Sequence, residues 1–324
     1  MKKSLLALGF SLLLTQVAHS ATLSADQSVR LQTLSAQLNV PMSEIKEAVT
    51  QADFRQEVLD AYKRPAESKP WYQYEALFLT DKRIHDGAVF WKEHAAALAR
   101  AEKVYQVPAN VIVAILGVET FYGTKMGQHP ILDSLYTLSF YHPTRTDFFS
   151  KEFVNYIKLG YQQGWDLKMK LGSYAGAMGM GQFMPSSYLA YAVDFDGDGH
   201  IDLFNSPDDA IGSVANYFHI HGWKMGEPVA EKAQLTNPQA AALVEKRVTQ
   251  KKTWSDLQAA GVRLATGLPA TTPVTLLAYE QESYVDYWVA RHNLYVITRY
   301  NQSPLYAMAV NDLSKAILKQ YAGQ

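Results

Sequence analysis

The sequence contains no cysteine among its 324 residues. Disulfides, thiolate nucleophiles, cysteine-ligated zinc and a lipid anchor on an N-terminal cysteine are therefore all excluded. An excess of one charge sign is also missing, because 30 Lys and Arg stand against 31 Asp and Glu. A formal net charge of −1 offers no global surplus to neutralise a phosphate backbone, so we expect no nucleic-acid partner.

Long apolar runs are missing after the first twenty residues. Lys2 and Lys3 precede an apolar run over residues 4–17, and small residues occupy the −3 and −1 positions at Ala18 and Ser20. This pattern is typical of a secretory signal peptide, so we expect residues 1–20 to be cleaved and the mature chain to be exported without a transmembrane segment. An uncleaved anchor is the alternative, but the run falls short of the roughly 18 residues that a span needs.

What the chain does contain is apolar and aromatic residues, with 48% hydrophobic positions, 20 Tyr and 6 Trp. This composition predicts an ordered globular protein, and the rings suit either a sugar- or peptide-binding groove or a bulky core. Helical spacing dominates, so we expect a mostly α fold. The composition of residues 226–264 predicts exposed helices. Two β-like runs, 274–279 and 287–300, precede a last predicted helix over 306–321.

Glu119 is the first candidate for chemistry. The run over residues 110–122 is apolar on every face until Glu119. The neighbours of Glu119 at helical spacing are Ile112, Ile115 and Leu116. Desolvation disfavours the ionised carboxylate, and a glutamate with a raised pKa is suited to act as a general acid near neutral pH. The alternative is a structural glutamate that pairs with an arginine or caps a backbone.

A glycine cluster is the second candidate, since Gly172, Gly176, Gly179 and Gly181 fall within ten residues. Small residues let a backbone approach a ligand, while nearby Ser173 and Gln182 supply neutral hydrogen-bonding groups for sugar hydroxyls. The dinucleotide fingerprint fails because Met184 stands where its third glycine belongs. Neither this segment nor the rest of the chain predicts an organic cofactor, and tight helix packing is the alternative explanation.

An aspartate-rich loop, residues 194–209, is the third candidate. Carboxylates at loop positions 1, 3 and 5, glycine at 6 and a backbone carbonyl at 7 are typical of an EF-hand calcium site. Position 12 is Asn205 instead of glutamate, so a later acid, either Asp208 or Asp209, must close the loop. We expect a structural Ca²⁺ here that stiffens a disulfide-free protein; the alternative is a metal-free turn that caps the next helix.

Four segments, taken in order, resemble the lytic murein transglycosylase B family: residues 118–123, 175–186, 194–217 and 295–301. The resemblance implies a lysozyme-like, mostly helical enzyme with an EF-hand-like loop and a small β component near the C-terminus. It further implies that residues 21–324 form one transglycosylase unit. Its parts would be an N-terminal helical region over 21–100, a lysozyme-like catalytic core over 101–225, and C-terminal helices and short strands over 226–324.

The family cleaves the β-1,4 bond between N-acetylmuramic acid and N-acetylglucosamine in peptidoglycan, leaving 1,6-anhydromuramic ends. The resemblance implies that Glu119 is the single catalytic acid/base, and that the partners are glycan strands and other cell-wall enzymes in the periplasm. The residues it assigns to the glycan groove are Tyr74, Arg145, Ser173, Gln182, Tyr217, Tyr300 and Tyr306. The calcium ligands it implies are Asp194, Asp196, Asp198, His200 and Asp209.

Three departures from the family pattern stand out. Thr144 replaces a second arginine beside Arg145, and the loop before Asp209 is about one residue longer than expected. The lipidated cysteine of membrane-bound members is absent, so we expect a form that is not a lipoprotein. Two other functions remain open: a conventional muramidase that uses water, and a non-catalytic peptidoglycan-binding scaffold.

Overall fold

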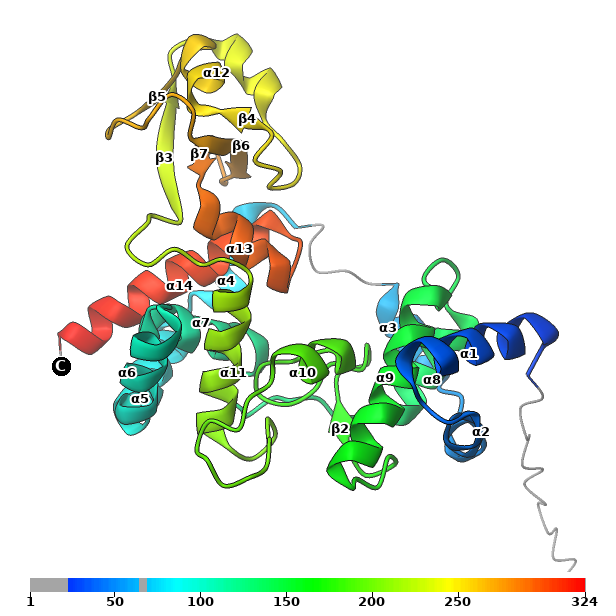
Figure 1. Ribbon diagram of the computed structural model, residues 1–324. Helices are drawn as coiled ribbons and strands as arrows, with labels where there is room; N and C mark the ends of the chain where they lie inside the picture. The colour runs from blue at the N-terminus through cyan, green and yellow to red at the C-terminus, as the bar shows by residue number, and fades with distance from the viewer. Residues whose placement is uncertain (1–22, 64–68, 324) are drawn as a thin grey trace, which may run out of the picture.

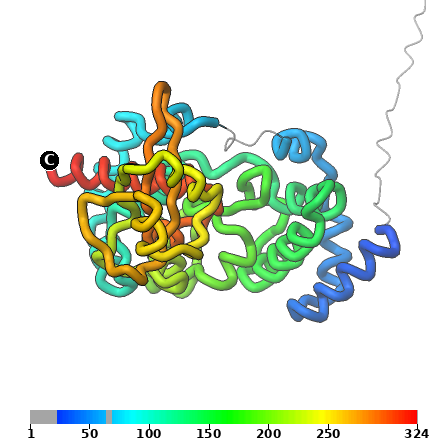
Figure 2. Tube along the Cα trace, turned by 90° about the horizontal axis from the view of Figure 1, so that it is seen from above, coloured from blue at the N-terminus to red at the C-terminus, as the bar shows by residue number. Residues whose placement is uncertain are grey.

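The computed structural model describes residues 23–63 and 69–323, so the expected signal peptide lies outside the described residues. The described chain is mostly helical, with the N-terminal helices at one end and a small sheet at the other (Figure 1). Figure 2 shows the same separation from above. Within the described ranges, no helix is both long enough and apolar enough to cross a membrane.

The first three helices pack on a helical pair from the middle of the chain. They are α1 (Ala25–Leu38), α2 (Met42–Gln51) and α3 (Gln56–Tyr62), and they contact α8 (Ile131–Tyr141) and α9 (Thr146–Gln163). A capping box at Ser24 starts α1 and satisfies its first backbone N–H groups. Buried Asp133 of α8 receives the Arg55 guanidinium at 2.7 Å, which fixes the entry to α3.

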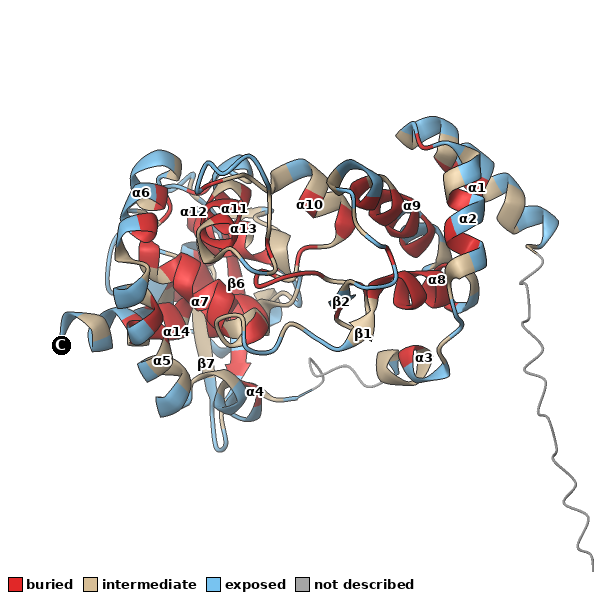
Figure 3. Ribbon diagram, turned by 90° about the horizontal axis from the view of Figure 1, so that it is seen from below, coloured by how far each residue is buried: buried red, intermediate tan, exposed pale blue. Residues whose placement is uncertain are grey.

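The centre of the molecule is α7 (Ala109–Thr120), which is buried on every face over residues 111–117. Four helices surround it: α5 (Asp81–Glu93), α6 (Ala95–Tyr105), α11 (Pro207–Ile220) and α14 (Pro304–Ala322) (Figure 3). An all-apolar sequence predicts such a position. The helix ends at Thr120, because Phe121 and Tyr122 adopt left-handed conformations with φ of 52° and 60°.

The chain that connects the two ends of the molecule is short and turn-rich. Its regular elements are α10 (Pro185–Tyr191) and a two-stranded antiparallel pair of β1 (His129–Pro130) with β2 (Leu171–Gly172). Helix α4 (Trp71–Phe78) packs instead on α14 and on the strand over residues 273–280. The glycine-rich segment 172–184 runs between β2 and α10. The Thr120 hydroxyl donates to the Met180 carbonyl at 2.7 Å, so this segment is attached directly to the end of α7.

The C-terminal sheet has five antiparallel strands in the order β4-β6-β7-β3-β5. The strands are β3 (Ala230–Leu235), β4 (Lys252–Thr253), β5 (Val262–Leu264), β6 (Pro273–Glu280) and β7 (Val285–Ala290). Together with the 3₁₀ helix η2 (Pro238–Leu243) and α12 (Trp254–Ala259), they enclose a small hydrophobic cluster of their own around Trp254 and Leu257.

Two expectations for this region were wrong. The stretch 226–264, expected as exposed helices, contains β3, β4 and β5. Its Ala-, Gln- and Lys-rich composition favours helix, but pairing of β3 with β7 supplies the backbone partners that override that weak preference. The second β-like run stops at Ala290, and α13 (His292–Tyr300) follows because Leu294, Val296 and Ile297 bury one helical face.

Candidate active site

Glu119 lies in the last turn of α7, where the fully buried helix reaches accessible space. The residues before it at helical spacing, Ile112, Ile115 and Leu116, are fully buried, whereas Glu119 itself has intermediate exposure. Glu119 therefore has buried apolar side chains on one side and remains partly accessible on the other. This position confirms the environment that the apolar run predicts.

The hydroxyl of Tyr306, in the first turn of α14, donates a hydrogen bond of 2.5 Å to Glu119 Oε1. Desolvation raises the pKa of Glu119 to about 7, and the hydrogen bond from Tyr306 opposes the rise because it favours the carboxylate. No second carboxylate of the described residues perturbs this pKa. Glu119 can therefore exchange a proton near neutrality, with a single phenol as its side-chain partner.

Tyr300 and Tyr217 continue the site beyond Tyr306. Their rings meet edge-on with centroids 4.8 Å apart, and the Tyr300 hydroxyl donates to the Gly181 carbonyl. The Tyr217 hydroxyl donates to the Arg299 carbonyl at 2.6 Å. Burial raises the pKa of Tyr300 well above its ordinary value, and the nearby Glu119 charge adds to the rise. These phenols therefore stay neutral hydrogen-bond donors.

Tyr74 approaches the same group from α4. Its ring is stacked with Trp71, with centroids 6.4 Å apart, and its charge interaction with Tyr306 contributes to the raised pKa of Tyr306. Trp71 in turn meets Tyr279 of β6 edge-on at 5.2 Å. The elements α4, α7, α13 and α14 thus bring Tyr74, Glu119, Tyr300 and Tyr306 together from positions far apart in the sequence.

Gln182 and Gly181 form the turn that faces these tyrosines. Gln182 has a left-handed backbone with φ of 51°, and its amide nitrogen donates to the Met126 and Gly179 carbonyls at 3.1 and 3.0 Å. A Cβ on Gly181 would lie 3.0 Å from the Tyr300 hydroxyl, so glycine permits this approach. The amide nitrogen of Gln182 therefore holds the turn together from within.

Ser173 and Arg145 lie at the other end of the glycine-rich segment, on the side of α8 and α9. The Ser173 hydroxyl accepts from the backbone N–H groups of Ala175 and Ala177, which shapes the turn. The exposed Arg145 guanidinium donates to the Tyr62 hydroxyl and lies 4.4 Å from the centre of the Phe148 ring. The structure records no contact between these two residues and Glu119.

Two aromatic residues at the site were missed in the sequence. Tyr62 of α3 contacts Arg145, and its ring lies 6.0 Å from that of Tyr174. Trp71 of α4 packs between Tyr74 and Tyr279 and so joins Tyr74 to the sheet. Their only sequence signal was the high aromatic content, which cannot separate a groove from a core.

The aspartate-rich loop brings three carboxylates together. Oxygen atoms of Asp194, Asp196 and Asp209 all lie within 4.8 Å of one another. Gly197 and Gly199 have left-handed φ angles of 81° and 91°, which let their N–H groups turn inward to Asp194 at 2.7 and 2.9 Å. Carboxylate oxygens in a tight loop are the ligands that Ca²⁺ takes, so this donor set fits the ion.

Of the two candidates for the closing acid, Asp209 is the one whose carboxylate lies with those of Asp194 and Asp196. It is buried and accepts from the backbone N–H groups of Phe195 and Asp202, both at 2.7 Å, while Asp208 faces Arg100 at 3.7 Å. Asp198 stands outside the three-carboxylate group and accepts from the His200 N–H at 2.8 Å. His200, expected to contribute its backbone carbonyl to the site, is exposed.

The fold and site together place one desolvated glutamate beside two tyrosines, Tyr306 and Tyr300. The chain matches the family described as Transglycosylase SLT domain over residues 24–315. It is 47% identical over 247 residues to the membrane-bound lytic murein transglycosylase B of Escherichia coli K12, covering 76% of this chain and 67% of that protein. The chain therefore belongs to the transglycosylase SLT domain family.

Solved structures agree with this assignment. The catenated lytic transglycosylase SltB1 of Pseudomonas aeruginosa is 43% identical, with a TM-score of 0.86 over 92% of this chain and 98% of that chain. The lytic transglycosylase Slt35 of Escherichia coli, solved in complex with calcium, is 39% identical, with a TM-score of 0.81 over 91% of this chain and 93% of that one.

Proposed function

We propose that this protein is a lytic transglycosylase that cleaves the β-1,4 bond between N-acetylmuramic acid and N-acetylglucosamine in peptidoglycan. The family supports the reaction class, since a relative covering most of this chain is a lytic murein transglycosylase. The observation that carries the assignment of Glu119 is its desolvated carboxyl group, with a pKa of about 7 and the Tyr306 hydroxyl 2.5 Å from Oε1.

The chemistry needs one group that first gives and then takes a proton. Protonated Glu119 donates its proton to the glycosidic oxygen, and the C1–O bond breaks with assistance from the acetamido group of the muramic acid. The resulting carboxylate takes the proton of the C6 hydroxyl while O6 bonds to C1, which closes the 1,6-anhydro ring and restores protonated Glu119. A pKa near 7 suits both steps, because neither form is strongly disfavoured at neutral pH.

A conventional glycosidase places two carboxyl groups across the bond, one of which attacks or activates water. Among the residues that the structure describes, Tyr306 alone perturbs the Glu119 pKa through a side-chain hydrogen bond. This environment suits attack by the substrate's own C6 hydroxyl. Tyr306 orients the carboxyl group and stabilises its charged form between the two steps.

We assign the predicted groove residues to two sides of the glycine-rich segment. Tyr74, Gln182, Tyr217, Tyr300 and Tyr306 would hold the sugars near Glu119, because their rings and amide suit hydroxyl and N-acetyl groups. Arg145 and Ser173 would contact the glycan strand farther from Glu119, on the side of α8 and α9. The lysozyme-like catalytic core over 101–225 and the other two parts stay predictions.

We infer that Asp194, Asp196 and Asp209 hold a structural Ca²⁺, supported by their converging oxygens and by the calcium complex of Slt35. The ion would tie the loop 194–209 to α11 and would take no part in the reaction. Export to the periplasm rests on the signal-peptide pattern of residues 1–20. The partners we propose are glycan strands, with other cell-wall enzymes as further candidates.

Purified sacculi provide the test. Digestion should release muropeptides with 1,6-anhydromuramic ends, identified by mass spectrometry. Products that carry only reducing ends would assign the protein as a muramidase instead. Absence of soluble products, together with retained binding to sacculi, would favour the scaffold function.

A further inference from the structure

The chain leaves α7 through a strained turn that begins two residues after Glu119. Phe121, Tyr122 and Gly123 follow one another with φ angles of 52°, 60° and 85°, so three consecutive residues are left-handed. Glycine adopts such angles freely, but they are unfavourable for the two aromatic residues. Strain of this kind persists only where the surrounding structure imposes it. The contacts of the turn therefore show what holds it in place.

The Tyr122 phenol is wedged between two helices. Its hydroxyl donates to the Arg83 carbonyl of α5 at 2.7 Å, and its ring is stacked with Phe90 at 5.6 Å between centroids. A Cβ on Gly87 of α5 would lie 2.4 Å from the hydroxyl oxygen, and a Cβ on Gly117 of α7 would lie 2.6 Å from it. A side chain at either glycine would therefore displace the phenol. We name these four neighbours of Tyr122 the phenol socket.

Further contacts bind the turn to the end of α7. The Arg83 guanidinium lies 4.8 Å from the centre of the Phe121 ring, and its Nε donates to the Gly117 carbonyl at 3.1 Å. The buried Thr120 hydroxyl accepts from the Gly123 N–H at 2.9 Å. The last turn of α7 is thus held just before and just after the glutamate that it carries.

Glu119 depends on this support because its carboxyl group is held out of water. Desolvation raises its pKa to about 7, and the Tyr306 hydroxyl of α14 opposes the rise. Tyr300 of α13 also faces it, since the Glu119 charge raises the pKa of Tyr300. The cations at the turn lie within 5.5 Å of the centre of the Phe121 ring: Lys82, Arg83 and Lys125. If the end of α7 frayed, the carboxyl group would move toward water and its pKa would fall toward the ordinary value.

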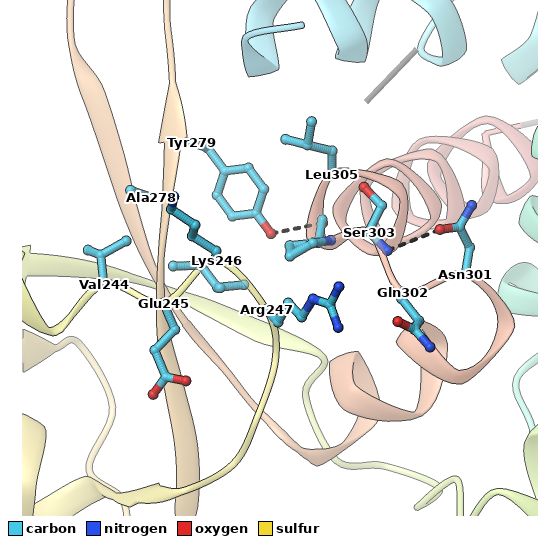
Figure 4. Close-up of a pocket in the computed structure, with 12 residues that line it drawn as sticks. Val244, Glu245, Lys246, Arg247, Ala278, Tyr279, Asn301, Gln302, Ser303 and Leu305 are labelled. Atoms are coloured by element: carbon cyan, nitrogen blue, oxygen red, sulfur yellow. Dashed lines mark hydrogen bonds between the residues drawn. The ribbon is translucent and has the colours of Figure 1, made fainter. Parts of the chain in front are cut away.

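The other partner of this hydrogen bond is fixed separately. The Ser303 hydroxyl caps α14 by accepting from the Tyr306 N–H at 3.4 Å. The buried Tyr279 hydroxyl of β6 donates to the Pro304 carbonyl at 3.1 Å, in the first turn of the same helix (Figure 4). These contacts involve neither α7 nor the phenol socket. Loss of the Tyr122 hydroxyl therefore acts on the glutamate side of the hydrogen bond.

We propose that Tyr122 is a positioning residue for Glu119, because its wedged phenol holds the left-handed turn 121–123 and thereby keeps the Glu119 carboxyl group against Tyr306. The effect on the reaction rests on the proposed function. One carboxyl group has to reach first the glycosidic oxygen and then the C6 hydroxyl, so a small displacement slows both steps. Tyr122 itself acts through Glu119 and has no contact with the reacting atoms in this scheme.

Tyr122→Phe tests the inference, because it keeps the ring and removes the hydrogen bond to the Arg83 carbonyl. A looser turn exposes the Glu119 carboxyl group, so the pH profile of kcat/KM should move to lower pH. The shift should reach up to about one pH unit, the equivalent of one hydrogen bond, and kcat should fall roughly tenfold. This direction is opposite to the one expected for Tyr306→Phe. Carboxyl ¹³C NMR measures the same titration without turnover, with Glu119→Gln to identify the signal.

Two further proteins complete the comparison. Tyr156→Phe is the matched control, since its buried hydroxyl also donates to a backbone carbonyl, that of Leu167 at 2.7 Å. Gly87→Ala acts from the opposite side of the socket, where its methyl group would meet the Tyr122 hydroxyl, while the flexible Ile317 side chain can move aside. It should shift the Glu119 titration in the same direction. The shift should be smaller in a Tyr122→Phe background, because the hydroxyl is already gone.

Melting temperatures show that each variant is folded. A Glu119 titration in Tyr122→Phe that coincides with that in Tyr156→Phe would overturn the inference, even if Tyr122→Phe melts at a lower temperature. An equal shift by Gly87→Ala in both backgrounds would overturn it as well, and this variant keeps the test open if Tyr122→Phe fails to fold. A wild type that forms no anhydro products would overturn the proposed function instead, while the NMR titration would still decide whether Tyr122 positions Glu119.

Discussion

The Tyr306 hydroxyl donates to Glu119 Oε1 at 2.5 Å and joins α14 to the end of α7 across 187 positions of sequence. Burial and this hydrogen bond act on the glutamate in opposite directions. Desolvation favours the protonated acid and the phenol favours the carboxylate, which places the pKa at about 7. The balance gives the single carboxyl group access to both protonation states near neutral pH.

Glu119→Gln should abolish turnover and preserve binding. The amide keeps the shape of the side chain but cannot donate and then accept the proton, so kcat should fall by about 10²–10⁴-fold or more. Zymograms and sacculus-binding assays measure the two properties separately. Unchanged clearing by this variant would show that Glu119 is not the acid/base.

Tyr306→Phe should move the pH profile of kcat/KM to higher pH. Loss of the donor removes the contribution that lowers the Glu119 pKa, so the protonated acid persists to more alkaline pH. Tyr156→Phe is the matched control, since its buried hydroxyl binds the Leu167 carbonyl and does not touch Glu119. A Tyr306→Phe profile that coincides with the control, or that moves to lower pH, would contradict this role.

Glu119 should also make the protein less stable as pH rises. Its carboxyl titrates at about 7 in the folded state, against an ordinary value of 4.5, so the folded state binds more protons between these values. The stabilising contribution is fully present below about pH 4.5 and is lost as pH rises through 7, on the order of 3 kcal/mol. The free energy of unfolding of Glu119→Gln relative to the wild type, measured with denaturant, should therefore be higher at pH 8 than at pH 5. Equal pH dependence in both proteins would contradict the raised pKa.

Calcium should raise the melting temperature through Asp209. An ion that binds only the folded state adds about 2.7 kcal/mol at a hundredfold excess over Kd. Asp209→Asn should lose the calcium-dependent rise, whereas Asp208→Asn should retain it, because Asp208 pairs with Arg100. Calorimetry with calcium and with a chelator measures both. An equal rise in both variants, or none in the wild type, would refute the assignment.

The burial around Glu119 could be predicted from the sequence because that environment is local. Ile112, Ile115 and Leu116 precede it on the same helix, so their burial could be inferred from spacing alone. The loop glycines and the carboxylates at positions 194 and 196 are equally local, since backbone geometry brings them together within a few residues.

Nonlocal relationships were harder to predict. Asp208 and Asp209 are neighbours in sequence but point about 100° apart on α11, and only the docking of that helix decides which one meets the loop. Strand β3 was misread because its partner β7 lies more than fifty residues away, and its alanines and lysines give no strand signal of their own. Arg145 and Glu119 are both predicted to line the glycan groove, and their positions near opposite ends of the glycine-rich segment follow only from the fold.

Digestion of peptidoglycan in water enriched in ¹⁸O tests the central assignment most directly. Water is not a reactant in the proposed reaction, so every cleaved muramic end should be the anhydro form, lighter by one water than a hydrolysed end and free of ¹⁸O. Glu119→Gln should give neither kind of end. Reducing muramic ends labelled with ¹⁸O would contradict the account, because they require water to attack C1 in place of the C6 hydroxyl.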